Sequence, residues 1–121
     1  MLKKIRLPLF AALLGMTLFA APASAGAYPR HQSGRRLITS YGVQSFDVVF
    51  VGGRHARVKI NGNDRSNLDL YVYDQNGNLI GRHTGFSDYG VVRWTPRWTG
   101  SFRIVVVNRG YRWNRYRIWT N

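Results

Sequence analysis

Hydrophobic and polar residues alternate with a period of two through most of the chain beyond residue 42. Such alternation is typical of β-strands with one buried and one solvent-facing side. Glycine, asparagine or proline separates the alternating segments, which cover residues 43–50, 56–60, 68–74, 79–83, 91–95, 102–107 and 116–118. No segment has helical periodicity, and no repeat is visible. The pattern therefore predicts an all-β fold, an antiparallel β-sandwich of about seven strands.

The apolar positions of these segments define the expected core. Asn76-Gly77 is typical of a tight hairpin turn, because both residues tolerate positive φ. Trp94 is expected in the core, and Pro96 ends its strand because proline lacks the N–H that a ladder needs. In the last segment we expect Tyr116 and Ile118 to face inward. The other expected inward positions are Phe46, Val48, Phe50, Ala56, Val58, Ile60, Leu68, Leu70, Val72, Val92, Phe102, Ile104 and Val106.

The first 25 residues have the pattern of a secretory signal peptide. Three basic residues come first, followed by an apolar run over residues 7–20 and by small residues at Ala23 and Ala25, where a signal peptidase would cut. The run is shorter than the roughly 20 residues that cross a bilayer core. We expect a periplasmic or secreted protein without a transmembrane segment after cleavage. Residues 26–42 predict a flexible basic leader, and residues 43–121 the β-sandwich domain.

The composition excludes several classes of protein. The chain of 121 residues has no cysteine and no glutamate, and 18 lysines and arginines oppose five aspartates. Removing the signal peptide lowers the formal net charge from +13 to +10, and every remaining basic residue except Lys59 is an arginine. A chain of this size forms one domain, and without cysteine it has neither disulfides nor thiol chemistry. Its charge favours anionic partners.

The last predicted strand carries the most specific candidate site. If Tyr116 and Ile118 face the core, alternation puts Trp113, Arg115, Arg117 and Trp119 on the outside. The same alternation places Arg93 and Arg103 outward on other strands. These candidate ligand-binding residues are Arg93, Arg103, Trp113, Arg115, Arg117 and Trp119. Guanidinium groups bind carboxylate, sulfate and phosphate, and indoles stack on rings. The alternative is that the arginines cover the tryptophans and keep the protein soluble.

A run of motifs resembles the bacterial pre-peptidase C-terminal domain. The motifs, in order, are Leu68-Asp69-Leu70, Asp74, Asn76-Gly77, Gly100-Ser101-Phe102 and Val107-Asn108, and the likeness extends from about residue 43 to residue 120. The resemblance implies a jelly-roll-like β-sandwich. In that family the domain is a non-catalytic appendage of secreted peptidases, and relatives in collagenases bind their substrate.

Metal binding and catalysis have weaker signals. Asp64 and Asp69 stand among asparagines whose oxygens could hold a calcium ion, but such residues more often cap turns, and we expect Asp69 to bond a neighbouring loop. The three histidines lack the spacing of zinc ligands. His83, Ser87 and Asp88 are close in sequence, but no nucleophile elbow surrounds the serine. We therefore expect no enzyme, no metal and no cofactor.

Two functions remain open. The first is an exported, non-catalytic binding or accessory module for an anionic or glycan surface, such as an anionic envelope polysaccharide. The second is a structural or protein-binding domain that docks on an exported enzyme through the edge formed by Trp113 and Trp119. Nucleic acid would bind only non-specifically, as it does to most strongly cationic domains.

Overall fold

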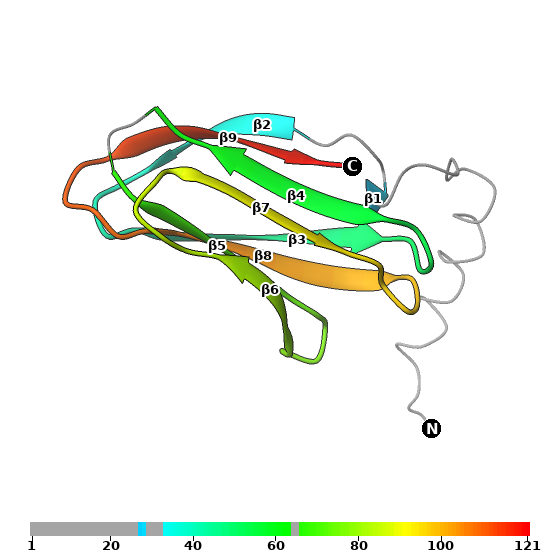
Figure 1. The fold of residues 1–121 in the computed structure, drawn as a ribbon. Helices are drawn as coiled ribbons and strands as arrows, with labels where there is room; N and C mark the ends of the chain where they lie inside the picture. The colour runs from blue at the N-terminus through cyan, green and yellow to red at the C-terminus, as the bar shows by residue number, and fades with distance from the viewer. Residues whose placement is uncertain (1–26, 29–32, 64–65) are drawn as a thin grey trace, which may run out of the picture.

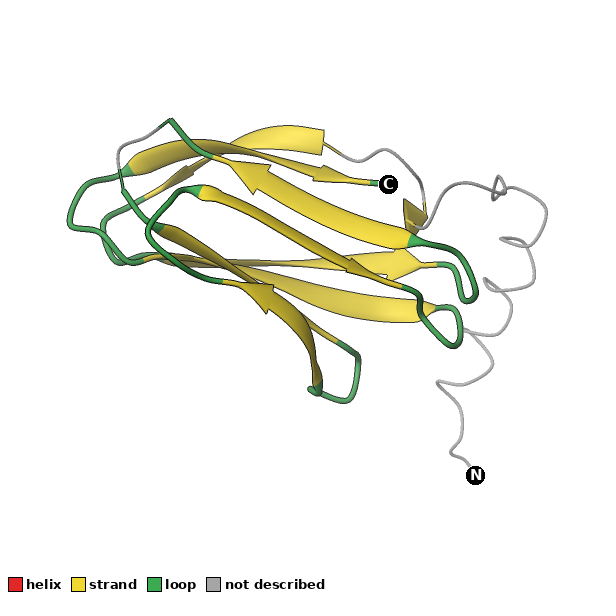
Figure 2. Ribbon diagram, viewed as in Figure 1, coloured by secondary structure: helices red, strands yellow, loops and turns green. Residues whose placement is uncertain are grey.

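The computed structural model describes residues 27–28, 33–63 and 66–121, which form nine strands and no helix (Figure 2). The strands are β1 (Ala27–Tyr28), β2 (Ser33–Ile38), β3 (Val43–Phe50), β4 (Ala56–Asn61), β5 (Leu68–Tyr73), β6 (Leu79–His83), β7 (Tyr89–Trp94), β8 (Gly100–Asn108) and β9 (Asn114–Thr120). The all-β prediction is confirmed. The predicted signal peptide lies outside the described residues. Nothing within them forms a helix that could cross a bilayer.

The strands form two layered sheets (Figure 1). One sheet has the order β1-β3-β8-β5-β6 and the other β2-β9-β4-β7, and all neighbouring strands are antiparallel. From β2 onward every connection except β5 to β6 crosses from one sheet to the other. This strand order is that of a jelly roll, as the resemblance to the pre-peptidase C-terminal domain implies.

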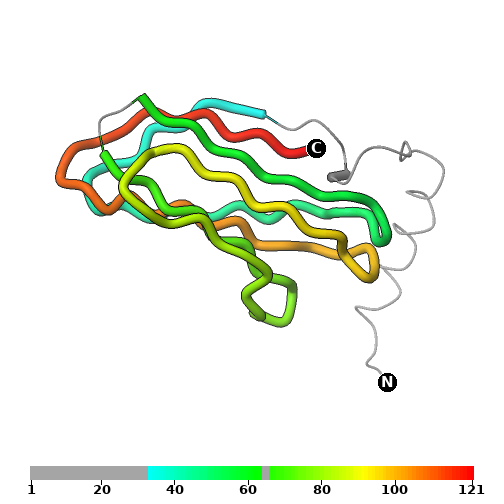
Figure 3. Tube along the Cα trace, in the orientation of Figure 1, coloured from blue at the N-terminus to red at the C-terminus, as the bar shows by residue number. Residues whose placement is uncertain are grey.

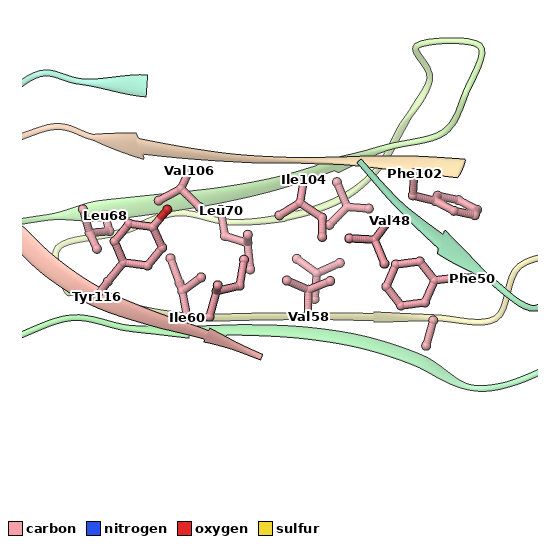
Figure 4. Packing of buried hydrophobic residues seen from close by; sticks show 14 of the residues in the cluster. Val48, Phe50, Val58, Ile60, Leu68, Leu70, Phe102, Ile104, Val106 and Tyr116 are labelled. Carbon is pink, nitrogen blue, oxygen red and sulfur yellow. The ribbon is translucent and has the colours of Figure 1, made fainter. Parts of the chain in front are cut away.

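The core lies between the sheets, where the inward side chains of both layers meet (Figure 4). Phe50, Val58, Ile60 and Ile104 are fully buried. Each such side chain contributes about 2 kcal/mol by leaving water. Trp94 is only half-buried, but it packs edge-on against Phe50 with ring centroids 4.7 Å apart. The alternation therefore predicts most of the core residues, and Trp94 lies at the margin of the core.

The Asn76-Gly77 turn joins β5 and β6 in a hairpin that projects from the body of the sandwich (Figure 3). Gly77 has φ of 84°, a value that favours glycine because it has no Cβ. The Asp74 carboxylate accepts hydrogen bonds from the backbone N–H groups of Asn76 and Asn78, each at 2.9 Å. These hydrogen bonds lower the pKa of Asp74 below its ordinary value, and the bond from the Asn78 N–H is the largest cause.

The predicted leader at 26–42 extends too far into the fold. Residues 33–38 are strand β2, which pairs along its whole length with β9. The sequence pattern misses this strand because β2 is an edge strand and only Ile38 is buried. A strand with one buried side chain shows no alternation of hydrophobic and polar residues. It forms because β9 offers its backbone a hydrogen-bonding partner. The sandwich therefore begins before residue 43.

Candidate functional site

Strand β9 places its side chains as the sequence predicts. Tyr116 is 1% exposed and Ile118 is 7% exposed, and both belong to the core. Arg115 is exposed, and Arg117 and Trp119 are half-buried on the other side of the strand. The Tyr116 hydroxyl donates a hydrogen bond of 2.6 Å to Gln44, and burial raises the pKa of this tyrosine. The two buried side chains therefore fix which side of β9 faces solvent.

The outer side of the β2-β9-β4-β7 sheet gathers six cationic side chains from all four strands. We call this surface the basic face, and its cations are Arg35, Arg57, Lys59, Arg93, Arg115 and Arg117. Among the described residues it carries no aspartate or glutamate. Asp47, Asp69 and Asp74 belong to β3, β5 and the turn after β5, and Asp88 is buried before β7. The charge asymmetry of the sequence is therefore concentrated on one sheet.

Strand register sets like charges directly opposite each other on the basic face. Arg35 on β2 pairs with Arg117 on β9, and Arg57 on β4 pairs with Arg93 on β7. Like charges at directly opposite positions destabilise a sheet, where a carboxylate partner would stabilise it. The free protein thus tolerates two repulsive pairs. An anion between their guanidinium groups would convert each repulsion into attraction.

Aromatic rings lie among these cations. The Lys59 ammonium is 4.8 Å from the centroid of the Trp119 ring and 5.8 Å from that of Tyr89. The Arg117 guanidinium carbon is 5.7 Å from the Trp119 centroid, and that of Arg115 is 5.8 Å from Trp113. These are cation–π contacts, worth about 0.5–1 kcal/mol each at exposed sites. They orient the cations and also cover part of each ring, so both sequence hypotheses for the Arg–Trp pattern have a geometric basis.

Five of the six predicted site residues lie on or beside the basic face. Arg93, Arg115, Arg117 and Trp119 occupy its strands, and Trp113 immediately precedes β9. Arg35, Arg57 and Lys59 were not predicted as site residues. Their strands join β9 only through the tertiary fold, although alternation in 56–60 already points Arg57 and Lys59 outward.

The sixth predicted residue, Arg103, lies elsewhere. It is on β8 in the opposite sheet, where its guanidinium donates to both oxygens of the Asp47 carboxylate, at 3.0 and 3.2 Å. This bidentate bond lowers the pKa of Asp47 and raises that of Arg103. The sequence places Arg103 outward correctly, but alternation does not reveal to which sheet a strand belongs. Arg103 is therefore not part of the basic face.

The acidic and amide cluster has a structural explanation. Asp69 is 5% exposed, and its Oδ2 accepts a hydrogen bond of 2.9 Å from Arg109 in the β8–β9 loop, which confirms the predicted bond to a neighbouring loop. Fully buried Asn114 donates to the Asp88 carboxylate at 3.1 Å and accepts from the backbone of Asn63. The described residues contain no group of three histidine or acidic side chains that could hold a metal ion, and Asp64 lies outside them.

The residues considered for nucleophilic catalysis have separate partners. His83 Nδ1 accepts a hydrogen bond from the backbone of Val91 at 3.1 Å, and the Ser87 hydroxyl contacts the backbone of Tyr89 at 3.3 Å. Asp88 is buried against Asn114. The three side chains therefore hold turns and strand ends, and they do not form the hydrogen-bonded relay of a serine hydrolase.

Known proteins are similar to this chain in fold but not in sequence. No family model and no curated protein matches the chain. The pre-peptidase C-terminal domain of a collagenase from Bacillus anthracis is similar in structure, with a TM-score of 0.57, 8% identity, and coverage of 76% of this chain and 90% of that one. The periplasmic inhibitor of g-type lysozyme from Aeromonas hydrophila, PliG, has a TM-score of 0.53 at 17% identity, with coverage of 84% and 91%.

A mitogen from Yersinia pseudotuberculosis is also similar, with a TM-score of 0.56 at 12% identity over 76% of this chain and 85% of that one. At these identities the likeness shows the fold alone. The predicted resemblance to the pre-peptidase C-terminal domain is therefore supported as a shared β-sandwich architecture.

Proposed function

We propose that this protein is an exported, non-catalytic module that binds an anionic polymer, such as an acidic envelope polysaccharide, through its basic face. Two arginine pairs carry the proposal: Arg35 lies directly opposite Arg117, and Arg57 directly opposite Arg93. Among the described residues, this side of the sheet has no aspartate or glutamate. A surface needed only for solubility gains nothing from opposed like charges. A polyanion would neutralise both pairs at once.

The predicted signal peptide supports a location in the periplasm or outside the cell. The collagenase domain and the lysozyme inhibitor show that similar sandwiches serve as an enzyme's accessory domain and as a binding protein. Nucleic acid would bind the same cations through its phosphates, which carry no sequence information, so we expect this binding to be non-specific. The polymer we propose is therefore an extracytoplasmic polyanion.

Thermal unfolding of an Arg93→Gln variant tests the proposal. The substitution removes one charge from the Arg57–Arg93 pair but keeps most of the side chain. Relief of about 0.5 kcal/mol of repulsion should raise the unfolding midpoint of the free protein by about 2–4 °C. Polygalacturonate should raise the midpoint of the wild type and raise that of the variant less. A matched Arg82→Gln variant on β6, in the other sheet, should change neither quantity.

The proposal is wrong if polygalacturonate leaves the wild-type midpoint unchanged at low salt, or if both variants respond to the polymer like the wild type. A lower midpoint for free Arg93→Gln would show that the opposed pairs are not repulsive.

A second candidate, docking on an exported protein, is favoured by a different surface. The β2–β3 and β8–β9 loops lie side by side at one end of the sandwich (Figure 1), linked by a hydrogen bond from Tyr41 N–H to Gly110 C=O of 3.0 Å. Tyr41, Tyr111 and Trp113 form an aromatic tip there and are 67%, 72% and 42% exposed. Tyr41 has φ of 55°, an unfavourable value for a residue with a Cβ.

Buried Asn108 holds the aromatic tip in place. Its amide donates to the backbone carbonyls of Thr39 and Arg112 at 2.9 and 2.8 Å, one in each loop, and its oxygen accepts from Gly110 N–H at 2.9 Å. Rigid tyrosine and tryptophan side chains are common anchors of protein interfaces. An exported protein held by this tip should remain bound at high salt and be lost in a Tyr111→Ala variant. Dissociation of the complex at high salt would contradict this candidate function and favour binding through the basic face.

A further inference from the structure

A cavity of about 380 Å³ lies away from the basic face, between the β5–β6 hairpin and the β7–β8 loop. Ile80 lines it on the hairpin side, Trp94 and Phe102 from the ends of two strands, and Arg97 and Trp98 from the loop. Its volume falls in the range of roughly 300–1,000 Å³ that small-molecule sites occupy. The lining is mainly apolar and aromatic, with a few polar groups.

The aromatic floor of the cavity is rigid. Trp94 and Phe102 both pack against buried Phe50, with ring centroids 4.7 and 5.8 Å from it, and they are 5.3 Å from each other. Trp98 stands beside them and is 58% exposed. An exposed indole next to a fixed aromatic floor is a surface on which a ring can stack.

The loop that carries Arg97 and Trp98 is held by the turn between β3 and β4. Gly53 donates a hydrogen bond to the Pro96 carbonyl at 2.8 Å, and Gly52 donates to the Thr99 hydroxyl at 2.9 Å. A Cβ at Gly52 would lie 2.5 Å from the Trp98 Cα, so only glycine allows this approach. The loop is therefore fixed before any ligand arrives, which reduces the entropic cost of binding.

Arg97 gives the cavity a guanidinium group that can hold an anionic group of a ligand. Arg97 is exposed and makes no side-chain hydrogen bond or ion pair with the described residues. Asp74 also lines the cavity, but its oxygens accept hydrogen bonds from Asn76 and Asn78 in its own turn, at 2.9 to 3.1 Å. The carboxylate is thus committed to the hairpin, whereas the guanidinium is available to a ligand's carboxylate.

We propose that this cavity binds a single acidic sugar residue, with a pyranose ring on Trp98 and a carboxylate on Arg97. The C–H groups on one face of a pyranose carry slight positive charge, which the negative face of an indole attracts. The Trp94 and Phe102 rings are inclined to each other by 53°, so they offer no parallel slot that could sandwich a nucleobase. The site is separate from the basic face and does not depend on it.

The test follows the indole N–H signals of the four tryptophans by NMR during titration with glucuronate, glucose and AMP. Glucuronate should shift the Trp98 signal at millimolar concentration and leave that of Trp119 unchanged. Trp98→Phe should assign the signal, and Trp98→Ala should weaken binding at least tenfold, followed through the backbone signals of Ile80 and Thr95. Because Trp98 is largely exposed, the variant should keep the wild-type thermal midpoint.

Arg97→Gln should remove the preference for glucuronate over glucose but leave stacking on Trp98 intact. Equal binding of the two sugars by the wild type, tighter binding of AMP, or no shift at Trp98 would each overturn the proposal. An Arg115→Gln/Arg117→Gln variant should bind glucuronate like the wild type. Its weaker binding of polygalacturonate would then concern the basic face alone, so the two proposals can fail independently.

Discussion

Replacing Arg115 and Arg117 with glutamine removes two of the six charges of the basic face without touching the core. Both side chains lie on the outer side of β9, whose inner side is anchored by Tyr116 and Ile118. The double variant should fold like the wild type. It loses the cation–π contacts to Trp113 and Trp119, and it relieves the repulsion between Arg117 and Arg35. Its binding of a polyanion should become less sensitive to salt.

The magnitude follows from counterion release. On a flexible polyanion, the logarithm of the binding constant falls with the logarithm of salt concentration by roughly 0.7 for each neutralised charge. Six engaged cations give a slope of about −4, and the double variant should give about −3. The assay is fluorescence-detected titration with heparin at several salt concentrations, with the slope fitted for each protein.

Arg82→Gln/Arg103→Gln is the matched control, because it removes the same net charge from the other sheet. Losing the exposed Arg103–Asp47 ion pair, whose side chains are 59% and 55% exposed, should cost little stability. The control should keep the wild-type slope. Equal slopes for both double variants would refute the reasoning, since net charge and not the basic face would then govern binding.

Two further predictions concern stability. Trp94→Ala should destabilise the protein by about 3 kcal/mol, which is the lower end for truncation of an aromatic side chain because Trp94 is only half-buried. Trp94→Phe should cost less than about 1.5 kcal/mol, because the buried indole N–H has no hydrogen-bond partner to lose. Urea unfolding measures both, and equal losses would contradict this. The lowered pKa of Asp74 means that its stabilisation is complete above the unfolded value near 3.8 and is lost as pH falls through the lower folded value. Asp74→Asn should therefore make the free energy of unfolding fall less steeply between about pH 6 and pH 3, and an unchanged profile would show that the turn does not stabilise the ionised carboxyl.

Much of the fold follows from local pattern. The strand β8 is recognisable because Phe102, Ile104 and Val106 alternate with more exposed neighbours, and the structure buries those three. The hairpin at Asn76-Gly77 follows from backbone preference alone. The edge strand β2 could not be predicted, because its pairing with β9 joins residues about 80 positions apart and leaves no local trace beyond Ile38.

The features of the candidate site can also be separated into those that local pattern predicts and those that depend on the tertiary fold. Alternation determines that Arg93, Arg103, Arg115 and Arg117 all face solvent, because a residue's side of its strand is set by its immediate neighbours. Which of them share a surface depends on the sheet to which each strand belongs, and the jelly-roll order puts β8 in one sheet and β7 and β9 in the other. Only the tertiary structure therefore separates Arg103 from the others, brings Arg57 and Lys59 beside β9, and sets arginines opposite one another. The sequence by itself determines which side chains of each strand face the core and which face solvent. Long-range hydrogen bonding between strands decides which of the solvent-facing side chains share a surface.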